Sequence, residues 1–195
     1  GLRIAVLGDV RLDASAPQST AVKRFRSALR AARAARVDQV LLTGDVVTRG
    51  TSANLSFARS ILQSELGSVP WAWAPGDSDR AGDLAAYRKV LGAPAEVFDR
   101  AGIRFIRLNS AAGSVRAGGF QRPVRRRQAL TRSVNNRNVR AAVVLMHHPA
   151  RALVPGAGRR LSDRREADLI EDLLGNAAGR GTPIAMVTGH GRRFQ

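Results

Sequence analysis

Residues 37–47 read Val-Asp-Gln-Val-Leu-Leu-Thr-Gly-Asp-Val-Val, an apolar run that ends in glycine and aspartate. A short apolar run bounded by turn-forming residues is typical of a buried strand, which we place at Val37 to Leu42. The same arrangement recurs near both ends of the chain, where Gly8-Asp9 and Gly189-His190 each follow an apolar run. The sequence therefore places polar groups with metal-binding capacity directly after buried strands.

Strands and helices alternate along the chain. Apolar runs predict strands at residues 3–7, 37–42, 69–74, 103–108, 141–146 and 183–188, and helical spacing predicts helices at 18–35, 53–66, 83–91 and 163–174. This alternation indicates an α/β fold and favours a largely parallel sheet that is buried on both faces. We expect a single domain over residues 1–195, because the chain is long enough to bury a core and its composition shows no break.

Charge is the strongest compositional feature. The chain has 32 Lys and Arg residues against 15 Asp and Glu, a formal net charge of +17, and only Lys23 and Lys89 are lysines. One interpretation is a surface that binds anions. The other interpretation is that a GC-rich genome favours arginine codons. The even spread of arginine along the chain supports this second interpretation. No helix-turn-helix, zinc finger or aromatic RNA-binding pattern accompanies the charge, so we do not expect nucleic acid as a partner.

The same composition excludes several classes of protein. Cysteine is absent, which excludes disulfides and thiolate metal ligands but leaves both a cytoplasmic and a secreted location open. No apolar run approaches the roughly 20 residues that a membrane span needs. The run Leu2 to Leu7 is too short for the apolar core of a signal peptide, so we expect no targeting segment in this chain.

Acidic and imidazole side chains gather where the predicted strands end. The residues that follow strands in this way are Asp9, Asp45, Asp77, His147, His148 and His190, which include every histidine of the chain. In open α/β sheets, ligands bind beyond the carboxyl ends of the strands. A single such aspartate is usually a turn former, but their coincidence at one edge indicates a functional site.

These segments also resemble, in order, the signature of the calcineurin-like metallophosphoesterase superfamily: D-x-H, G-D, G-N-H-[DE], a strand-end histidine and G-H-x-H. The matching segments here are Asp9-Val10-Arg11, Gly44-Asp45, Gly76-Asp77-Ser78-Asp79, His147-His148-Pro149 and Gly189-His190-Gly191-Arg192. The resemblance implies two packed β-sheets flanked by helices, an αββα sandwich. It also implies two divalent metals between the strand ends, which clamp a phosphate and generate a nucleophile.

One of the two implied metal sites is complete in this sequence. The second metal would use Asp45, Asp77 in place of the family's asparagine, His147 and His190. Two carboxylates and two imidazoles suit Mn, Fe or Zn. We therefore expect one divalent metal at this site, with no bound metal as the alternative.

The other implied site has lost two of its ligands. The first metal would use Asp9, Arg11, Asp45 and Arg192, where both arginines replace family histidines. A guanidinium stays protonated and has no lone pair to donate to a metal. We expect Arg11 and Arg192 to replace the first metal electrostatically or to bind phosphate. Ser78, which stands at the position of the family's leaving-group histidine, and His148 are further candidates for phosphate binding.

Two functions stay open at this point. The first is phosphoester hydrolysis of a phosphorylated ligand at a degenerate site that keeps one of two metals. The second is a catalytically inactive binding or assembly module, favoured by the loss of histidines at three signature positions. Family members usually continue past the last motif with further strands, whereas this chain ends at Gln195. We therefore expect either a fragment of a longer protein or a protein partner that completes the second sheet.

Overall fold

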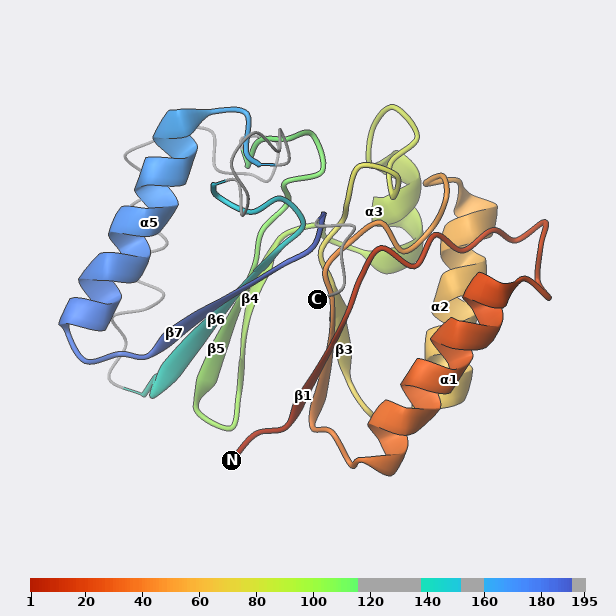
Figure 1. Cartoon of the computed structure of the whole chain (residues 1–195), viewed down its shortest axis with the longest axis horizontal. Coiled ribbons are helices and arrows are strands. Elements are labelled where there is room, and N and C mark those ends of the chain that lie inside the picture. The colour runs from red at the N-terminus through yellow and green to blue at the C-terminus, as the bar shows by residue number, and fades with distance from the viewer. Residues whose placement is uncertain (116–137, 152–159, 191–195) are drawn as a thin grey trace.

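Two β-sheets form the centre of the molecule in a computed structural model that describes residues 1–115, 138–151 and 160–190 (Figure 1). The first sheet contains three parallel strands in the order β1 (Ile4–Leu7), β2 (Gln39–Leu42) and β3 (Trp71–Trp73). The second sheet contains β4 (Glu96–Arg100), β5 (Ile103–Arg107), β6 (Ala141–Met146) and β7 (Ile184–Thr188) in that order. Within it, β4 is antiparallel to β5, and the other pairs are parallel.

Helices cover the outer face of each sheet. The helices α1 (Thr20–Ala34), α2 (Ser52–Leu66) and α3 (Ala85–Leu91) pack on the first sheet, and α5 (Arg164–Gly179) packs on the second (Figure 1). The inner faces meet in an apolar layer that includes Leu41 and Ala72 from one sheet and Phe105, Val143 and Leu145 from the other. The expected two-sheet α/β sandwich is therefore confirmed. The single central sheet suggested by strand–helix alternation is wrong, because one face of each sheet is covered by the other sheet.

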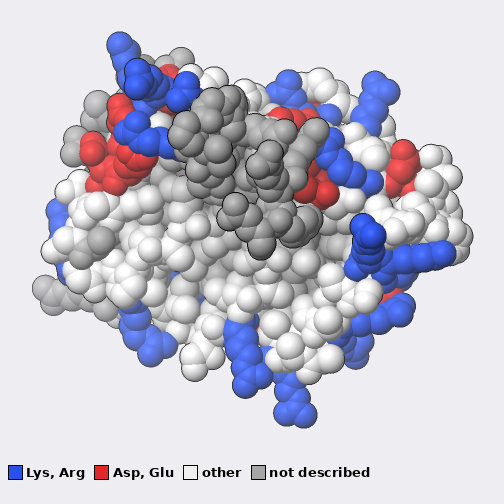
Figure 2. All heavy atoms as spheres, viewed as in Figure 1, with Lys and Arg blue, Asp and Glu red and all other residues white. Residues whose placement is uncertain are grey.

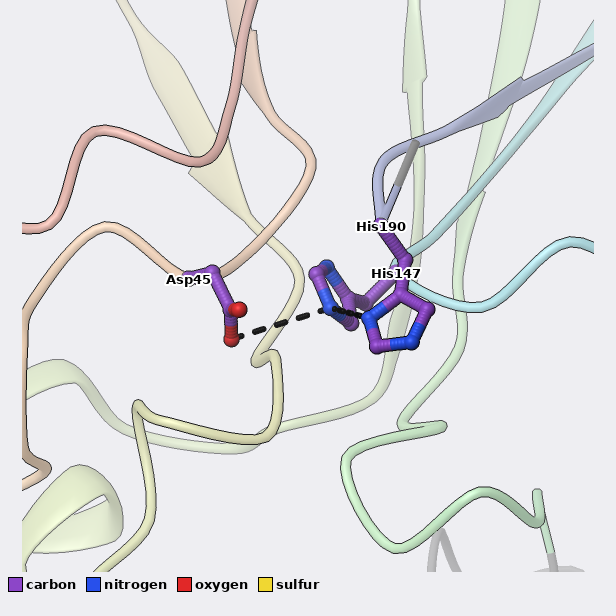
Figure 3. A group of neighbouring side chains, drawn as sticks. All are labelled: Asp45, His147 and His190. Atoms are coloured by element: carbon purple, nitrogen blue, oxygen red, sulfur yellow. Dashed lines mark hydrogen bonds and ion pairs between the residues drawn. The ribbon is translucent and has the colours of Figure 1, made fainter. Parts of the chain in front are cut away.

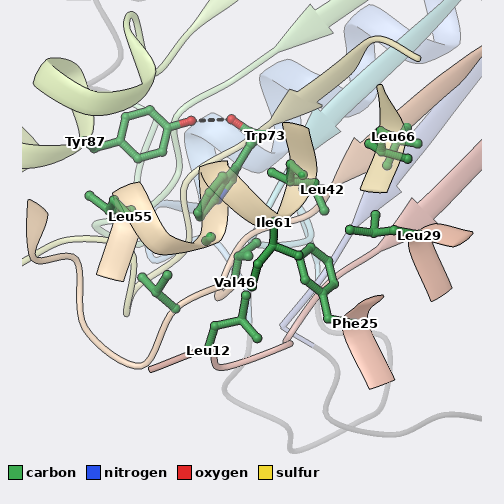
Figure 4. Packing of buried hydrophobic residues seen from close by; sticks show 14 of the residues in the cluster. Leu12, Phe25, Leu29, Leu42, Val46, Leu55, Ile61, Leu66, Trp73 and Tyr87 are labelled. Atoms are coloured by element: carbon green, nitrogen blue, oxygen red, sulfur yellow. Dashed lines mark hydrogen bonds between the residues drawn. The ribbon is translucent and has the colours of Figure 1, made fainter. Parts of the chain in front are cut away.

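The largest apolar core lies between the first sheet and its helices (Figure 4). Helix α1 buries Val22, Phe25, Leu29 and Ala32, which share one face because they are three or four residues apart. Trp73 packs edge-to-face on Tyr87, with ring centroids 6.0 Å apart, and the Tyr87 hydroxyl donates a hydrogen bond to the Trp73 carbonyl. Trp73 is thus a packing residue.

The strand β4 was not predicted from the sequence. Most of its side chains are exposed, so it lacks the apolar alternation that reveals a half-buried strand. It forms a hairpin with β5 through Ala101 and Gly102, whose φ angles of 49° and 76° are those of a tight hairpin turn. Pairing with β5 rather than burial defines this strand.

Charged groups are distributed over the surface that Figure 2 shows. In that view the Lys and Arg side chains of the described residues lie in several separate groups around the edge of the face and do not form one continuous patch. The densest group of arginines in the sequence, Arg122, Arg125, Arg126 and Arg127, lies outside the described residues. None of the helices in the described ranges is long and apolar enough to span a membrane.

Candidate metal centre

Glycines allow the loops after the strands to approach one another closely. Gly44 has a φ of +94°, and a Cβ atom there would lie 2.7 Å from both the Gly76 nitrogen and His147 Nδ1. A Cβ atom on Gly76 would lie 2.4 Å from the Asp45 nitrogen. Since real Cβ atoms do not come this close to backbone, only glycine permits the loops after β2 and β3 to meet beside His147.

The His147 ring is held in one orientation from the opposite sheet. His147 is fully buried at the end of β6, and its Nδ1 lies 2.7 Å from the Thr43 carbonyl oxygen at the end of β2. A carbonyl only accepts hydrogen bonds, so Nδ1 carries the proton and Nε2 presents its lone pair. Metal-ligating histidines commonly have this outer hydrogen bond, which fixes their tautomer and orientation.

Three side chains from three strand ends converge at this lone pair (Figure 3). His147 Nε2 lies 2.8 Å from His190 Nδ1 and 3.6 Å from Asp45 Oδ1. Burial lowers the pKa of His190, and the neighbouring imidazoles lower it further, which favours the neutral form that can bind a metal. Asp45, His147 and His190 each offer one ligand atom within 4.8 Å of the others, and this donor set fits a divalent transition metal.

The fourth predicted ligand, Asp77, lies near the same His190 nitrogen that faces His147. Its Oδ2 is 3.7 Å from His190 Nδ1, and its Oδ1 is 3.1 Å from His148 Nε2. Burial acts to raise the pKa of Asp77, but the hydrogen bond from His148 and the charges of the imidazoles outweigh it and leave this pKa below its usual value. Two triads that share His190 result, and the second consists of Asp77, His190 and His148, which the sequence predicted for phosphate binding and not as a metal ligand.

Arg11 and Ser78 bind the carboxylate oxygens of Asp45. The Arg11 guanidinium forms an ion pair with Asp45 Oδ2. The Ser78 amide and hydroxyl lie 2.9 and 3.0 Å from Oδ1, and the hydroxyl also lies 2.7 Å from the Val47 carbonyl. Arg11 thus pairs with one carboxylate oxygen of Asp45 and Ser78 with the other, and replacement of the first metal by Arg11 stays a prediction. The single hydroxyl proton of Ser78 is already donated within the protein. These contacts do not test phosphate binding by Ser78, which stays a prediction.

Asp9 belongs to neither triad of the described residues. Its Oδ1 is buried and has no hydrogen-bond partner among the described residues. The residue that we expect to neutralise it, Arg192, lies outside the described ranges. The predictions for Asp9 and Arg192 therefore remain predictions.

Four of the site residues have unusual backbone conformations. Asp9, Arg11, Asp45 and His190 have φ angles of 53°, 61°, 53° and 62°. Residues other than glycine rarely adopt positive φ, and such strain of about 1–3 kcal/mol per residue concentrates at functional sites. All four residues lie in the loops that follow β1, β2 and β7.

Asp79 holds together the loops that carry the site residues, a role that was not predicted from the sequence. It is completely buried, and its Oδ1 accepts hydrogen bonds from the amides of Val46 and Val47 at 2.9 and 3.1 Å. Its Oδ2 accepts from Trp73 Nε1 at 3.0 Å and from the Gly76 amide at 2.8 Å. Asp79 thereby ties the loop after Asp45 to the loop that carries Asp77. The one indication in the sequence was that Asp79 is the acidic residue of the third motif, Gly76-Asp77-Ser78-Asp79.

The geometry and motif order agree with a comparison against family models, in which the model for calcineurin-like phosphoesterases matches residues 2–190. The chain belongs to the calcineurin-like phosphoesterase family. The resemblance drawn from the motifs is therefore confirmed. A comparison with curated protein sequences gives no match.

Solved structures with the same fold include two distant neighbours. A dimetal phosphatase from Danio rerio is 12% identical with a TM-score of 0.65, over 97% of this chain and 88% of that one. GAP50, the anchor in the inner membrane complex of Plasmodium, is 16% identical with a TM-score of 0.58, over 91% of this chain and 63% of that one. At these identities the similarity shows the fold alone.

Proposed function

We propose that this chain is a single-domain, metal-dependent phosphoesterase that uses one divalent metal rather than two. The observation that carries the proposal is the convergence of Asp45 Oδ1, His147 Nε2 and His190 Nδ1, with His147 already oriented by the Thr43 carbonyl. We assign Mn, Fe or Zn to this triad, with Asp77 next to it. A metal bound there would polarise a phosphoryl oxygen and lower the pKa of a bound water.

Arg11 takes the place of the first metal in this proposal. Its ion pair with buried Asp45 supplies a positive charge on the side where the family has its first metal. About a third of the Arg11 side chain is exposed, and a guanidinium has five donors, so it also has donors to offer a phosphate oxygen. We assign Arg192 the same role toward the buried Asp9 oxygen.

Hydrolysis of aryl phosphates tests the proposal. With added Mn²⁺, the protein is expected to hydrolyse 4-nitrophenyl phosphate or its bis ester, and Asp45→Ala is expected to abolish this turnover. The exposed carboxylate of Asp172 on α5 provides the matched control, because Asp172→Ala removes the same group far from the site. Equal turnover in wild type and Asp45→Ala would contradict the proposal.

An inactive binding or assembly module is the second candidate function. It is favoured by the Arg11–Asp45 ion pair and by Ser78, which holds Asp45 where the family has a leaving-group histidine. The fold similarity to GAP50, whose description is that of an anchor, is consistent with such a role. Absence of turnover with every phosphoester tested, in protein whose folding is intact, would favour this candidate. A partner that completes the second sheet would belong to it.

A further inference from the structure

A pocket of about 380 Å³ lies beside the candidate metal centre. The described residues that line it are Asp77, Arg80, Ala111, Ala112, Gly113 and His148, and we call it the Arg80 pocket. It shares Asp77 and His148 with the triad around His190. The rest of a phosphoester bound at the metal centre therefore has space to extend into this pocket.

Arg80 carries the unpaired charge of the pocket. Asp77 and His148 bind each other across 3.1 Å. Arg80 is half-buried, and within the described residues it has neither a hydrogen bond nor an ion pair. A guanidinium in such a position is suited to bidentate binding of a carboxylate or phosphate.

The backbone of Arg80 is held firmly. The preceding residue is Asp79, which accepts four hydrogen bonds. On the other side, a Cβ atom on Gly50 would lie 2.5 Å from the Arg80 nitrogen, so the two backbones pack in close contact. Because the Arg80 backbone is held in place, less conformational entropy is lost when its side chain binds a ligand.

The opposite wall is small and offers no aromatic surface. It consists of Ala111, Ala112 and Gly113, and this turn is closed by a 2.8 Å hydrogen bond from the Gly113 amide to the Ser110 carbonyl. His148, whose ring binds Asp77, is the one aromatic side chain among the lining residues that the structure describes. Phe, Tyr and Trp are absent from these described lining residues, so the pocket offers a nucleobase or an aryl group no larger ring to stack on.

We propose that the Arg80 pocket binds a second anionic group of the substrate. The preferred substrates are then small phosphoesters that carry a carboxylate or a further phosphate a few bonds from the scissile group. The inference rests on the proposed phosphoesterase function, because the metal centre must hold the first phosphate. Arg80 is a binding residue in this scheme.

Two phosphonates that differ only in the second anion test this. Binding of 3-phosphonopropionate and of propylphosphonate is measured by calorimetry in saturating Mn²⁺, for wild type, Arg80→Met and Arg80→Lys. Arg24→Met, at an exposed arginine of α1, is the matched control for loss of one charge. Wild type is expected to prefer 3-phosphonopropionate, and Arg80→Met to weaken its binding by about 10- to 100-fold while propylphosphonate binding changes little. Arg80→Lys should restore part of the preference.

Equal binding of the two probes by wild type, or equal weakening of both by Arg80→Met, would overturn the inference. Absence of binding of either probe would overturn it as well. Turnover of 4-nitrophenyl phosphate is followed on the same preparations and reports the proposed function separately. Selective binding without turnover of any phosphoester tested would reject the phosphoesterase and leave the anion site standing, whereas turnover without selective binding would reject the Arg80 pocket alone.

Discussion

Replacement of Asp79 by asparagine is expected to lower the free energy of unfolding by about 4 kcal/mol, because two of its four buried donors lose their acceptor. Both carboxylate oxygens accept two N–H groups each. Whichever way the asparagine amide turns, its NH₂ group faces two donors in a site without water access. Burial raises the pKa of the Asp79 carboxyl, and the surrounding donors oppose this rise by stabilising the charged form.

Chemical denaturation of wild type and Asp79→Asn measures this loss. Asp83→Asn is the matched control, since Asp83 is exposed and, among the described residues, its carboxylate accepts one hydrogen bond, from the Ala85 amide. The control is expected to stay close to wild type. Similar unfolding midpoints for Asp79→Asn and Asp83→Asn would show that Asp79 does not organise the loops as described.

Loss of the His147 imidazole is expected to weaken metal binding by at least about 100-fold. Removal of a residue that only hydrogen-bonds to a metal ligand already lowers metal affinity by about 10- to 100-fold, and His147 is a ligand itself. His147 is the ligand common to the contacts with Asp45 and His190. The direct measurement is a Mn²⁺ or Zn²⁺ titration of wild type and His147→Ala, each stripped of metal beforehand.

The neighbouring histidine provides the control for this prediction. His148 is also buried at the end of β6, but its Nε2 contacts Asp77 and it belongs to the other triad. His148→Ala is expected to retain most of the metal affinity. If His148→Ala lost more affinity than His147→Ala, the metal would belong to the triad of Asp77, His148 and His190 instead.

The sequence predicted most of the fold because burial leaves a periodic record. Val22, Phe25 and Leu29 lie on one face of α1, as their spacing predicts, and the apolar run before Asp45 forms a strand buried along its whole length. The spacing of apolar residues does not reveal the number of sheets. The side chains of Leu41 and Phe105 are apolar whether they face a helix or another sheet, so only the resemblance indicated two layers.

The candidate site was predictable in its location and less so in its contacts. Ligands beyond the strand ends follow from the topology of parallel strands, and Asp45, His147 and His190 meet there. The formation of a second triad by Asp77 and His148 depends on where loop side chains point, which no spacing rule describes. The bonds of Asp79 likewise join residues from 46 to 79 through the folded loops, and local patterns carry no trace of them.

The most direct test of a single metal centre is the metal content of the protein. Protein purified without chelator and analysed by elemental mass spectrometry is expected to contain one equivalent of Mn, Fe or Zn per chain. That result would agree with a cation on Asp45, His147 and His190 and with Arg11 in place of the other. Two equivalents of transition metal per chain would contradict the account, because the proposal holds a single cation at the strand ends and puts Arg11 in place of the other.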